Sequence, residues 1–292
     1  MSYSHEFNYR VQNDFSGYEK FISFYNNTKL LMFDEIYLDF QNCTWFEANL
    51  SSVLGAIVSK LQYDINSVYF NNMPSQIESI LSKNTFLSNF GGESKQDTYG
   101  TTVPYRKFKT IDQKAFTNYI SSELLSLPSL PVMSDALKKK VKECILEIFI
   151  NAQTHGATQN IFSCGQYYPK KGRVDFSIVN LGSTIQKEVS KYFNQEVQSV
   201  PAIQWAIEEG NTTRTGNIPG GIGLSTLLSF IQLNKGKVQI ISGDGYWLRN
   251  SSGTHFETFQ EYFDGTIVNI EFNVNDTNSY ILSGEDSWDN IF

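Results

Sequence analysis

The sequence predicts an α/β (α+β) protein made of two units, and three observations support this prediction. The chain has 292 residues, enough for two domains at roughly 100–200 residues each. Its first half alternates helix-like and strand-like stretches, an order that gives a mainly parallel sheet covered by helices. Its second half places one long amphipathic helix before several strand-like segments, of which the last two read as closing antiparallel strands.

Composition limits the class of protein. Hydrophobic residues make up 40% and charged residues 18% of the chain, which favours a packed core over a disordered chain. The formal net charge of -7 makes a nucleic-acid partner unexpected, because such proteins carry basic surfaces. Three scattered cysteines, no signal peptide and no apolar run near the ~20 residues of a membrane helix predict a cytoplasmic protein that contacts no membrane.

Apolar spacing assigns the elements of the first half. Phe15, Tyr18 and Phe21 recur at helical spacing and place a helix over 15–24. The later elements follow from the same reasoning and from prolines and glycines. They are a strand over 35–40, a helix over 46–61, a strand over 67–70, a helix that begins at Pro74, a linker or extended hairpin over 90–102, and a helix over 114–125.

The second half begins with its longest element. Ser134 can cap a helix over 135–154, and Gly156 is a natural helix stop. The remaining elements are strands over 160–164 and 173–180, a polar region over 182–220 that contains a short helix over 201–208, a helix over 224–233, and strands over 237–242 and 266–272.

Three short segments could carry chemistry. On the long helix, Glu147 and Asn151 lie one turn apart, and such a pair aimed into a cleft can hold Mg²⁺ and orient a water molecule. The alternative is a solvated helix face. Asn180 and Gly182 close a strand, as in an ordinary turn. The glycine-rich segment 216–224 leads into a helix, where backbone N–H groups suit phosphates; the alternative is a flexible loop with a helix cap. Its spacing matches neither the P-loop nor the Rossmann fingerprint.

The order of these segments resembles the GHKL (histidine-kinase-like, Bergerat) ATP-binding fold. The four matching segments are Glu147-x-x-x-Asn151-Ala152, Asn180-x-Gly182, Gly220-Gly221-x-Gly223-Leu224 and Gly265-Thr266-x-x-x-Ile270. The resemblance covers about residues 134–274. It implies a two-layer α/β sandwich over 106–292 that binds ATP and Mg²⁺.

The resemblance also implies roles for single residues. Asn151 matches the asparagine that ligates Mg²⁺, and Glu147 matches the acid that serves as general base in active members. The implied nucleotide contacts come from Asn180 and Gly182 at the adenine, Thr266 near the adenine, Gly220, Gly221, Gly223 and Leu224 around the triphosphate, and Arg214 in the lid over 182–220. Arg214 is equally well explained as a solvated lid residue.

The sequence departs from the family pattern at three positions. The adenine-reading aspartate is replaced by Asn180, which can accept a hydrogen bond from the adenine amino group but without charge assistance. Thr184 stands in place of the second glycine of that motif, and Thr154 in place of a phosphate-contacting lysine. These departures imply modest nucleotide affinity, with catalysis slow or absent.

The N-terminal half, residues 1–105, resembles a STAS-like α/β interaction domain over 35–61. The serine that is phosphorylated in anti-sigma-factor antagonists falls on Ala48, with Ser51 and Ser52 one turn further on. If Ala48 is the equivalent position, the domain is not phosphorylated in the usual way. The alternative is any small α/β interaction domain.

Together these features predict a cytoplasmic ATP-binding regulatory protein, either a slow ATPase or a nucleotide-controlled switch. One alternative is a serine/threonine protein kinase of the anti-sigma-factor type acting on a STAS partner, and another is an inactive interaction module. A complete sensor histidine kinase is not expected, because no phosphoacceptor helix pair is evident. A protein partner is expected, and a homodimer is one arrangement that the family allows.

Overall fold

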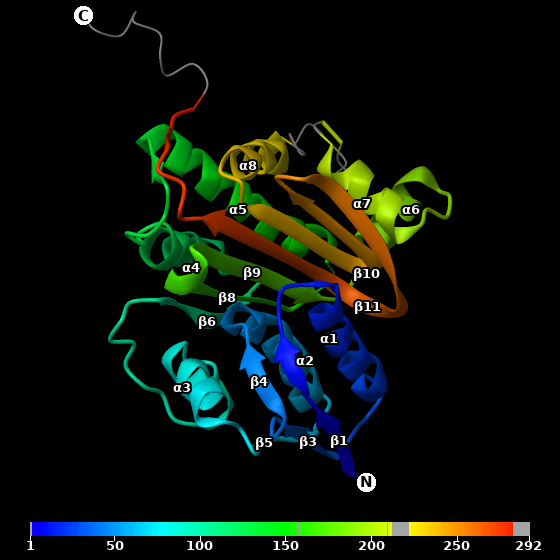
Figure 1. Cartoon of the computed structure of the whole chain (residues 1–292). Helices are drawn as coiled ribbons and strands as arrows, with labels where there is room; N and C mark the ends of the chain where they lie inside the picture. The colour runs from blue at the N-terminus through cyan, green and yellow to red at the C-terminus, as the bar shows by residue number, and fades with distance from the viewer. Residues whose placement is uncertain (1, 157, 209, 212–221, 283–292) are drawn as a thin grey trace, which may run out of the picture.

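The computed structural model describes residues 2–156, 158–208, 210–211 and 222–282. The chain is stacked in layers, with a small sheet at one end, then the helices α1 and α2, then a large sheet, and a second helical layer on its far side (Figure 1). This alternation of sheets and helices agrees with the predicted α/β class.

The N-terminal layers follow the predicted order. The strands β1 (Ser2–Glu6), β3 (Glu35–Asp39) and β5 (Ser67–Asn71) form a parallel sheet in that order. The helices are α1 (Phe15–Thr28), α2 (Ser51–Tyr63) after a short turn over Ala48–Leu50, and α3 (Ser75–Lys83). Three strands of this half were not predicted. They are β1, the edge strand of that sheet, and β2 (Tyr9–Val11) and β4 (Cys43–Phe46), which pair with each other in parallel.

The large sheet has five antiparallel strands in the order β10-β11-β9-β8-β6. Their bounds are Lys237–Asn250, Gly253–Asn273, Arg173–Leu181, Asn160–Tyr168 and Thr102–Lys109. The prediction of closing antiparallel strands is therefore confirmed, but β10 and β11 are far longer than expected. Their extensions form a hairpin whose Tyr246, Phe259 and Phe263 pack into the core around α1.

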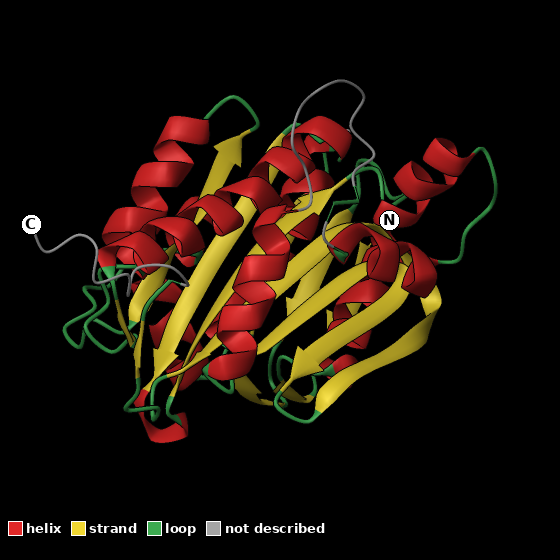
Figure 2. Ribbon diagram, turned by 90° about the horizontal axis from the view of Figure 1, so that it is seen from above, coloured by secondary structure: helices red, strands yellow, loops and turns green. Residues whose placement is uncertain are grey.

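Helices cover the far face of this sheet (Figure 2). The longest, α5 (Asp135–His155), begins as predicted, with the Ser134 hydroxyl accepting a hydrogen bond from the Leu137 N–H at 3.1 Å. The others are α4 (Gln113–Tyr119) with a π-helical turn over Ile120–Leu124, α6 (Ile185–Phe193), α7 (Ser199–Ile207) and α8 (Ile222–Leu233). None of the described helices combines the length and apolar character that crossing a bilayer needs.

The two halves of the chain share one hydrophobic core. Apolar side chains of α1 and α2 pack with Phe162, Val179 and Ile267 of the large sheet. The predicted boundary between residues 105 and 106 falls inside β6, all of which belongs to the large sheet. The second core lies between that sheet and the far helices, and a short parallel pair of β7 (Val132–Met133) and β12 (Ser279–Tyr280) closes it at one end.

Candidate functional site

Five of the ten predicted site residues line a pocket on the far face of the large sheet, and Gly182 is not among its lining residues. The pocket has a cavity volume of ≈ 140 Å³, and α5, α6, α7, α8 and three strands line it. Among its lining residues are Glu147, Asn151, Asn180, Leu224 and Thr266. These five residues come from segments that lie far apart in the sequence, and the fold brings them to one place.

The helix α5 supplies Glu147 and Asn151 from successive turns. Ile148 and Ala152, beside them on the helix, are buried in the core. Because residues four apart share a helix face, the buried neighbours fix α5 with its polar pair at the pocket. This is the arrangement that the helical spacing predicted.

The end of β9 supplies the floor of the pocket. Asn180 is only 5% exposed, and its side-chain nitrogen has no hydrogen-bond partner among the described residues. A buried amide without a partner is costly, so it marks a position where a ligand group could bind. The backbone N–H of Ser183 donates to the Gly156 carbonyl at 2.6 Å and thereby ties this strand end to the end of α5.

Gly182 occupies a backbone conformation that other residues avoid. Its φ is 137°, and its N–H donates to the Asp264 carbonyl at 2.9 Å. Thr184, by contrast, has φ −98° and caps α6, since its hydroxyl accepts a hydrogen bond from the Lys187 N–H at 3.3 Å. Thr184 therefore has a structural role at this position, as the N-cap of α6.

Thr266 lies directly opposite Asn180 in the pairing of β11 with β9. Its hydroxyl is 3.0 Å from the Ser242 hydroxyl, which also accepts a hydrogen bond from the Ile185 N–H at 2.9 Å. The sequence prediction placed Thr266 near Asn180, and the sheet register gives the reason.

The glycine-rich segment is only partly described. Arg214, Gly220 and Gly221 lie outside the described residues. The helix α8 is described from Ile222, so it includes Gly223 in its first turn, and Leu224 lines the pocket.

Among the lining residues that sequence reasoning missed, three carry large polar or aromatic side chains. They are Glu188, Trp205 and Asn211, which come from α6, α7 and the segment after it. The Ser183 hydroxyl donates to Glu188 at 2.6 Å. In the sequence, Thr184 could have indicated the start of α6, because threonine often caps helices.

The pocket contains no metal-binding cluster of the usual kind. In the described part of the chain, no three His, Cys, Asp or Glu side chains gather as a metal site would require.

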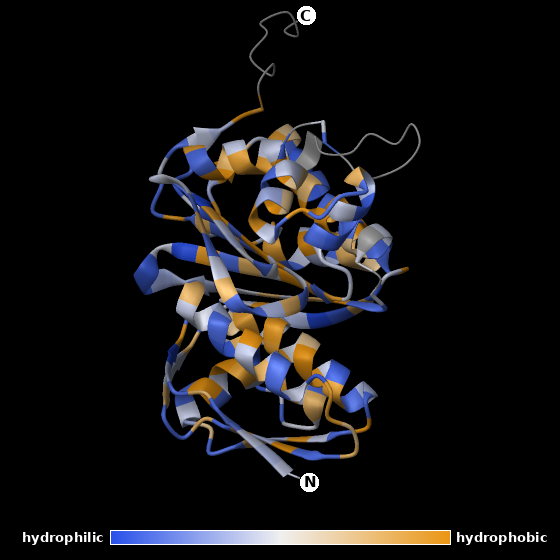
Figure 3. Ribbon diagram, turned by 90° about the vertical axis from the view of Figure 1, so that its right-hand side faces the viewer, coloured by the Kyte–Doolittle hydropathy of each residue, from blue (hydrophilic) through white to orange (hydrophobic). Residues whose placement is uncertain are grey.

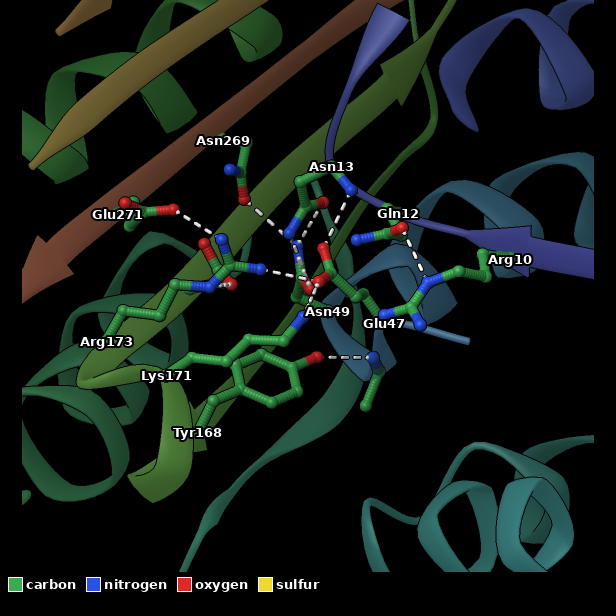
Figure 4. Close-up of polar contacts among 12 residues, drawn as sticks. Arg10, Gln12, Asn13, Glu47, Asn49, Tyr168, Lys171, Arg173, Asn269 and Glu271 are labelled. Carbon is green, nitrogen blue, oxygen red and sulfur yellow. Dashed lines mark hydrogen bonds and ion pairs between the residues drawn. The ribbon is translucent and has the colours of Figure 1, made fainter. Parts of the chain in front are cut away.

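A second polar cluster lies on the opposite face of the large sheet, between it and the N-terminal helices. We call it the buried polar seam, made of Asn13, Glu47, Asn49, Lys171, Arg173, Asp175, Ser177, Gln239, Asn269 and Glu271. Figure 4 shows most of these residues converging from the two halves of the chain. Sequence reasoning did not identify the seam, because its members are single polar residues within apolar elements.

Glu47 is the acidic centre of the seam. Its side chain is fully buried, and its carboxylate receives hydrogen bonds from the Asn13 N–H at 2.7 Å, Lys171 at 2.6 Å and Arg173 at 2.5 Å (Figure 4). Burial opposes the charged form, but the two cations and the N–H hold the pKa of Glu47 below its usual value.

Asn49 connects the seam across both halves of the chain. Its side-chain nitrogen donates to the Ser177 hydroxyl at 2.9 Å and to the side-chain oxygen of Asn269 at 3.0 Å. Because the partners lie on β9 and β11, the turn that starts α2 is fixed against the middle of the sheet.

The start of α2 is inaccessible as a result. Ala48, Ser51 and Ser52 are each 0% exposed. The Ala48 N–H donates to the Tyr168 hydroxyl at 2.8 Å, and the Ser51 hydroxyl accepts from Asn84 at 3.0 Å. The segment that resembles a STAS phosphorylation site therefore faces the sheet and not solvent.

No protein-family model matches the chain, and no curated protein is significantly similar to it.

Proposed function

We propose that the pocket binds Mg-ATP and that the chain is a cytoplasmic ATP-binding regulatory protein, a nucleotide-controlled switch with slow ATPase activity. The observation that supports this proposal is the convergence of Glu147, Asn151, Asn180, Leu224 and Thr266 on one pocket. The resemblance to the GHKL fold assigns nucleotide or metal contacts to four of these residues and the role of general base to Glu147. Convergence of this kind is what a shared ligand requires.

The adenine end of the site would be formed by Asn180 and Thr266. An amide group can accept a hydrogen bond from an exocyclic amino group and donate one to a ring nitrogen, which is how asparagine recognises adenine elsewhere. The partnerless nitrogen of Asn180 fits the donor half of that pairing. The loss of the family's aspartate is therefore compatible with binding, at reduced strength.

The phosphate end would be formed by Asn151, Glu147 and the start of α8. The oxygen of Asn151 would ligate Mg²⁺ together with phosphate oxygens, and the N-terminus of a helix favours anionic groups. Bound Mg²⁺ would neutralise charge on the phosphates. Glu147 lines the same pocket and is placed to accept a proton from an attacking water or hydroxyl.

The location of the N-terminal half favours a switch over phosphorylation of that half by the same chain. Ser51 and Ser52 are buried and face the sheet surface opposite to the pocket. A kinase activity would therefore need a separate partner, and it remains the second candidate function because Glu147 could activate a partner hydroxyl.

Calorimetry of the full chain with Mg-ATP tests the assignment. We expect Asn151→Ala to weaken Mg-ATP binding by roughly 10- to 100-fold, since it removes a ligand to a charged group. Chelation of Mg²⁺ with EDTA should weaken binding to the wild type in the same direction. The matched control is Gln153→Ala, an exposed residue on the same helix that does not line the pocket.

The outcomes separate the candidate functions. Unchanged affinity in Asn151→Ala would overturn the site assignment, and no binding of adenine nucleotide at millimolar concentration would favour the inactive interaction module. With labelled ATP, release of free phosphate that is lost in Glu147→Gln supports the ATPase. Label transferred to an added STAS protein supports the kinase instead.

A further inference from the structure

The outer face of the small parallel sheet is uncovered. No described helix or strand lies beyond it (Figures 1 and 3). Along β1, β3 and β5, alternate residues are the more exposed ones, as expected for side chains that point away from α1 and α2. The outward residues form three rows across the strands: Ser2, Glu35 and Ser67; Ser4, Tyr37 and Tyr69; Glu6, Asp39 and Asn71. All-parallel sheets usually have both faces covered, so the bare face calls for an explanation.

This face carries charge of one sign. Glu6, Glu35 and Asp39 lie on it, and the three strands contain no lysine or arginine. Among the described residues these carboxylates form no ion pair; Glu35 accepts a hydrogen bond from the Tyr37 hydroxyl at 2.8 Å, and Asp39 from the Asn72 amide at 3.1 Å. The face is therefore complementary to a cationic partner.

An aromatic pair occupies its centre. The rings of Tyr37 and Tyr69 are stacked, with centroids 5.2 Å apart and planes 18° from parallel. Tyr69 is 43% exposed. The exposed faces of such rings attract guanidinium groups, and nearby carboxylates strengthen that preference.

A rim of large apolar side chains borders one end of the face. We define the apolar rim as Leu30, Met32, Phe33, Tyr63 and Ile65, which are 58–87% exposed. Tyr63 is the last residue of α2, and the other four lie on the two loops that lead into β3 and β5. These loops are joined through Asn66, whose side chain donates to the Leu31 carbonyl at 2.8 Å and accepts from the Asp34 N–H at 3.0 Å.

Two rim residues occupy strained backbone conformations. Phe33 has φ 59° and Ile65 has φ 62°. This region is unfavourable for bulky side chains, and above all for a β-branched one. The chain therefore gives up stability to hold apolar side chains in water, an arrangement typical of interaction sites.

We propose that the outer face of the β1-β3-β5 sheet and the apolar rim together dock a basic, amphipathic segment of another protein. Its arginine side chains lie over Tyr37 and Tyr69 and beside Glu35 and Asp39, and its aliphatic side chains pack on the rim. A second copy of this chain would bring two acidic faces together, and an anionic lipid surface would be repelled by the same carboxylates.

The test measures binding of a labelled peptide that repeats Arg-Leu-Arg-Ser to the full chain by fluorescence anisotropy, without nucleotide. We expect the double variant Phe33→Asn and Ile65→Asn to weaken binding roughly five- to tenfold, as should Tyr37→Ser with Tyr69→Ser. Because asparagine tolerates positive φ, the first variant should be at least as stable to heat as the wild type. Its matched control is Ile111→Asn, an exposed isoleucine away from this surface.

Charge provides the second comparison. Glu35→Gln with Asp39→Asn should weaken peptide binding, whereas Glu78→Gln with Glu93→Gln, exposed carboxylates outside the face, should not. Equal loss in both variants would overturn the proposal, because binding would then reflect net charge alone. Two other results would also overturn it: a dimer that is lost in Phe33→Asn with Ile65→Asn, or tight binding to phosphatidylglycerol vesicles that the same substitutions abolish.

Discussion

Among the acids of the buried polar seam, Asp175 has the pKa that is shifted furthest from its usual value. Its side chain is fully buried, and the Arg173 guanidinium lies 3.0 Å away. Neither carboxylate oxygen receives a hydrogen bond from the described residues. Burial raises the pKa of Asp175 to about 7, although Arg173 acts in the opposite direction. This carboxyl group is therefore expected to titrate near neutral pH.

A raised pKa links this residue to stability. Between the usual aspartate pKa and about 7, the folded chain holds a proton that the unfolded chain releases, so the free energy of unfolding falls as pH rises. Asp175→Asn should remove this fall, which we expect to be on the order of 2 kcal/mol between pH 5 and 8. Urea denaturation at several pH values measures it, with Glu78→Gln as the control. An unchanged pH dependence in Asp175→Asn would contradict the assignment.

Single residues also show what the sequence could and could not reveal. Glu147 and Asn151 were predictable because helical spacing places them on one face. Asp175 was not, because its burial depends on which face of β9 packs against α2, and that follows from the sheet register. The sequence analysis identified Thr184 as a departure from the family's glycine motif. Its role as a helix cap could not be recognised, because the helix that follows it, α6, was not predicted.

At the scale of elements, β11 joins the pocket to the N-terminal helix α1. Asp264 on β11 contacts Lys187 of α6 at 3.0 Å and Lys29, directly after α1, at 3.3 Å. Its backbone carbonyl accepts a hydrogen bond from the Gly182 N–H. Two residues earlier, the Tyr262 hydroxyl lies 2.7 Å from the Thr184 hydroxyl, while its carbonyl accepts from Asn26 at 2.9 Å. A change at α6 can therefore reach α1 through direct contacts.

These contacts give a prediction about coupling, which rests on the proposed function. Mg-ATP should slow hydrogen exchange in α6 and in α1 of the wild type, because ordering α6 also fixes Asp264. In Asp264→Asn, which weakens both ion pairs, the protection of α6 should persist and that of α1 should shrink. Hydrogen exchange with mass spectrometry resolves the two helices. Equal protection of α1 in both proteins would show that Asp264 does not couple the pocket to α1.

The elements differ in how well the sequence identified them. The helix α5 was predicted almost to its ends, because a cap, a long apolar stripe and a terminal glycine all agree. The helix α6 was missed, since it is short and lies in a polar region between glycines. The β10–β11 hairpin was predicted only over 237–242 and 266–272. Its extension mixes aromatic, polar and charged residues and packs on α1, a segment that is distant in the sequence.

At the scale of the whole molecule, the shared core makes the two halves interdependent. The N-terminal helices cover Phe162, Val179, Ile241 and Ile267 on the sheet, each no more than 3% exposed. Removal of these helices would expose a continuous apolar face and break the seam around Glu47. The two predicted units follow one another along the chain, but they pack around a shared hydrophobic core.

This packing predicts how the chain unfolds. The full chain should unfold in one cooperative thermal transition, and a fragment that begins at Thr102 should be aggregation-prone or bind hydrophobic dyes. Calorimetry and near-ultraviolet circular dichroism measure both properties. The prediction fails if the fragment keeps native near-ultraviolet signals, or if the full chain shows two transitions that match the two halves.

The strand β9 serves the pocket and the seam at successive positions. Ile178 and Asn180 line the pocket, while Asp175, Ser177 and Val179 face the N-terminal helices. Because side chains alternate along a strand, inserting or deleting one residue would send each set to the wrong side. Insertions or deletions in β9 between the seam and Asn180 should therefore be tolerated only when they comprise an even number of residues. The pocket residues and the seam residues of this strand can then shift only together.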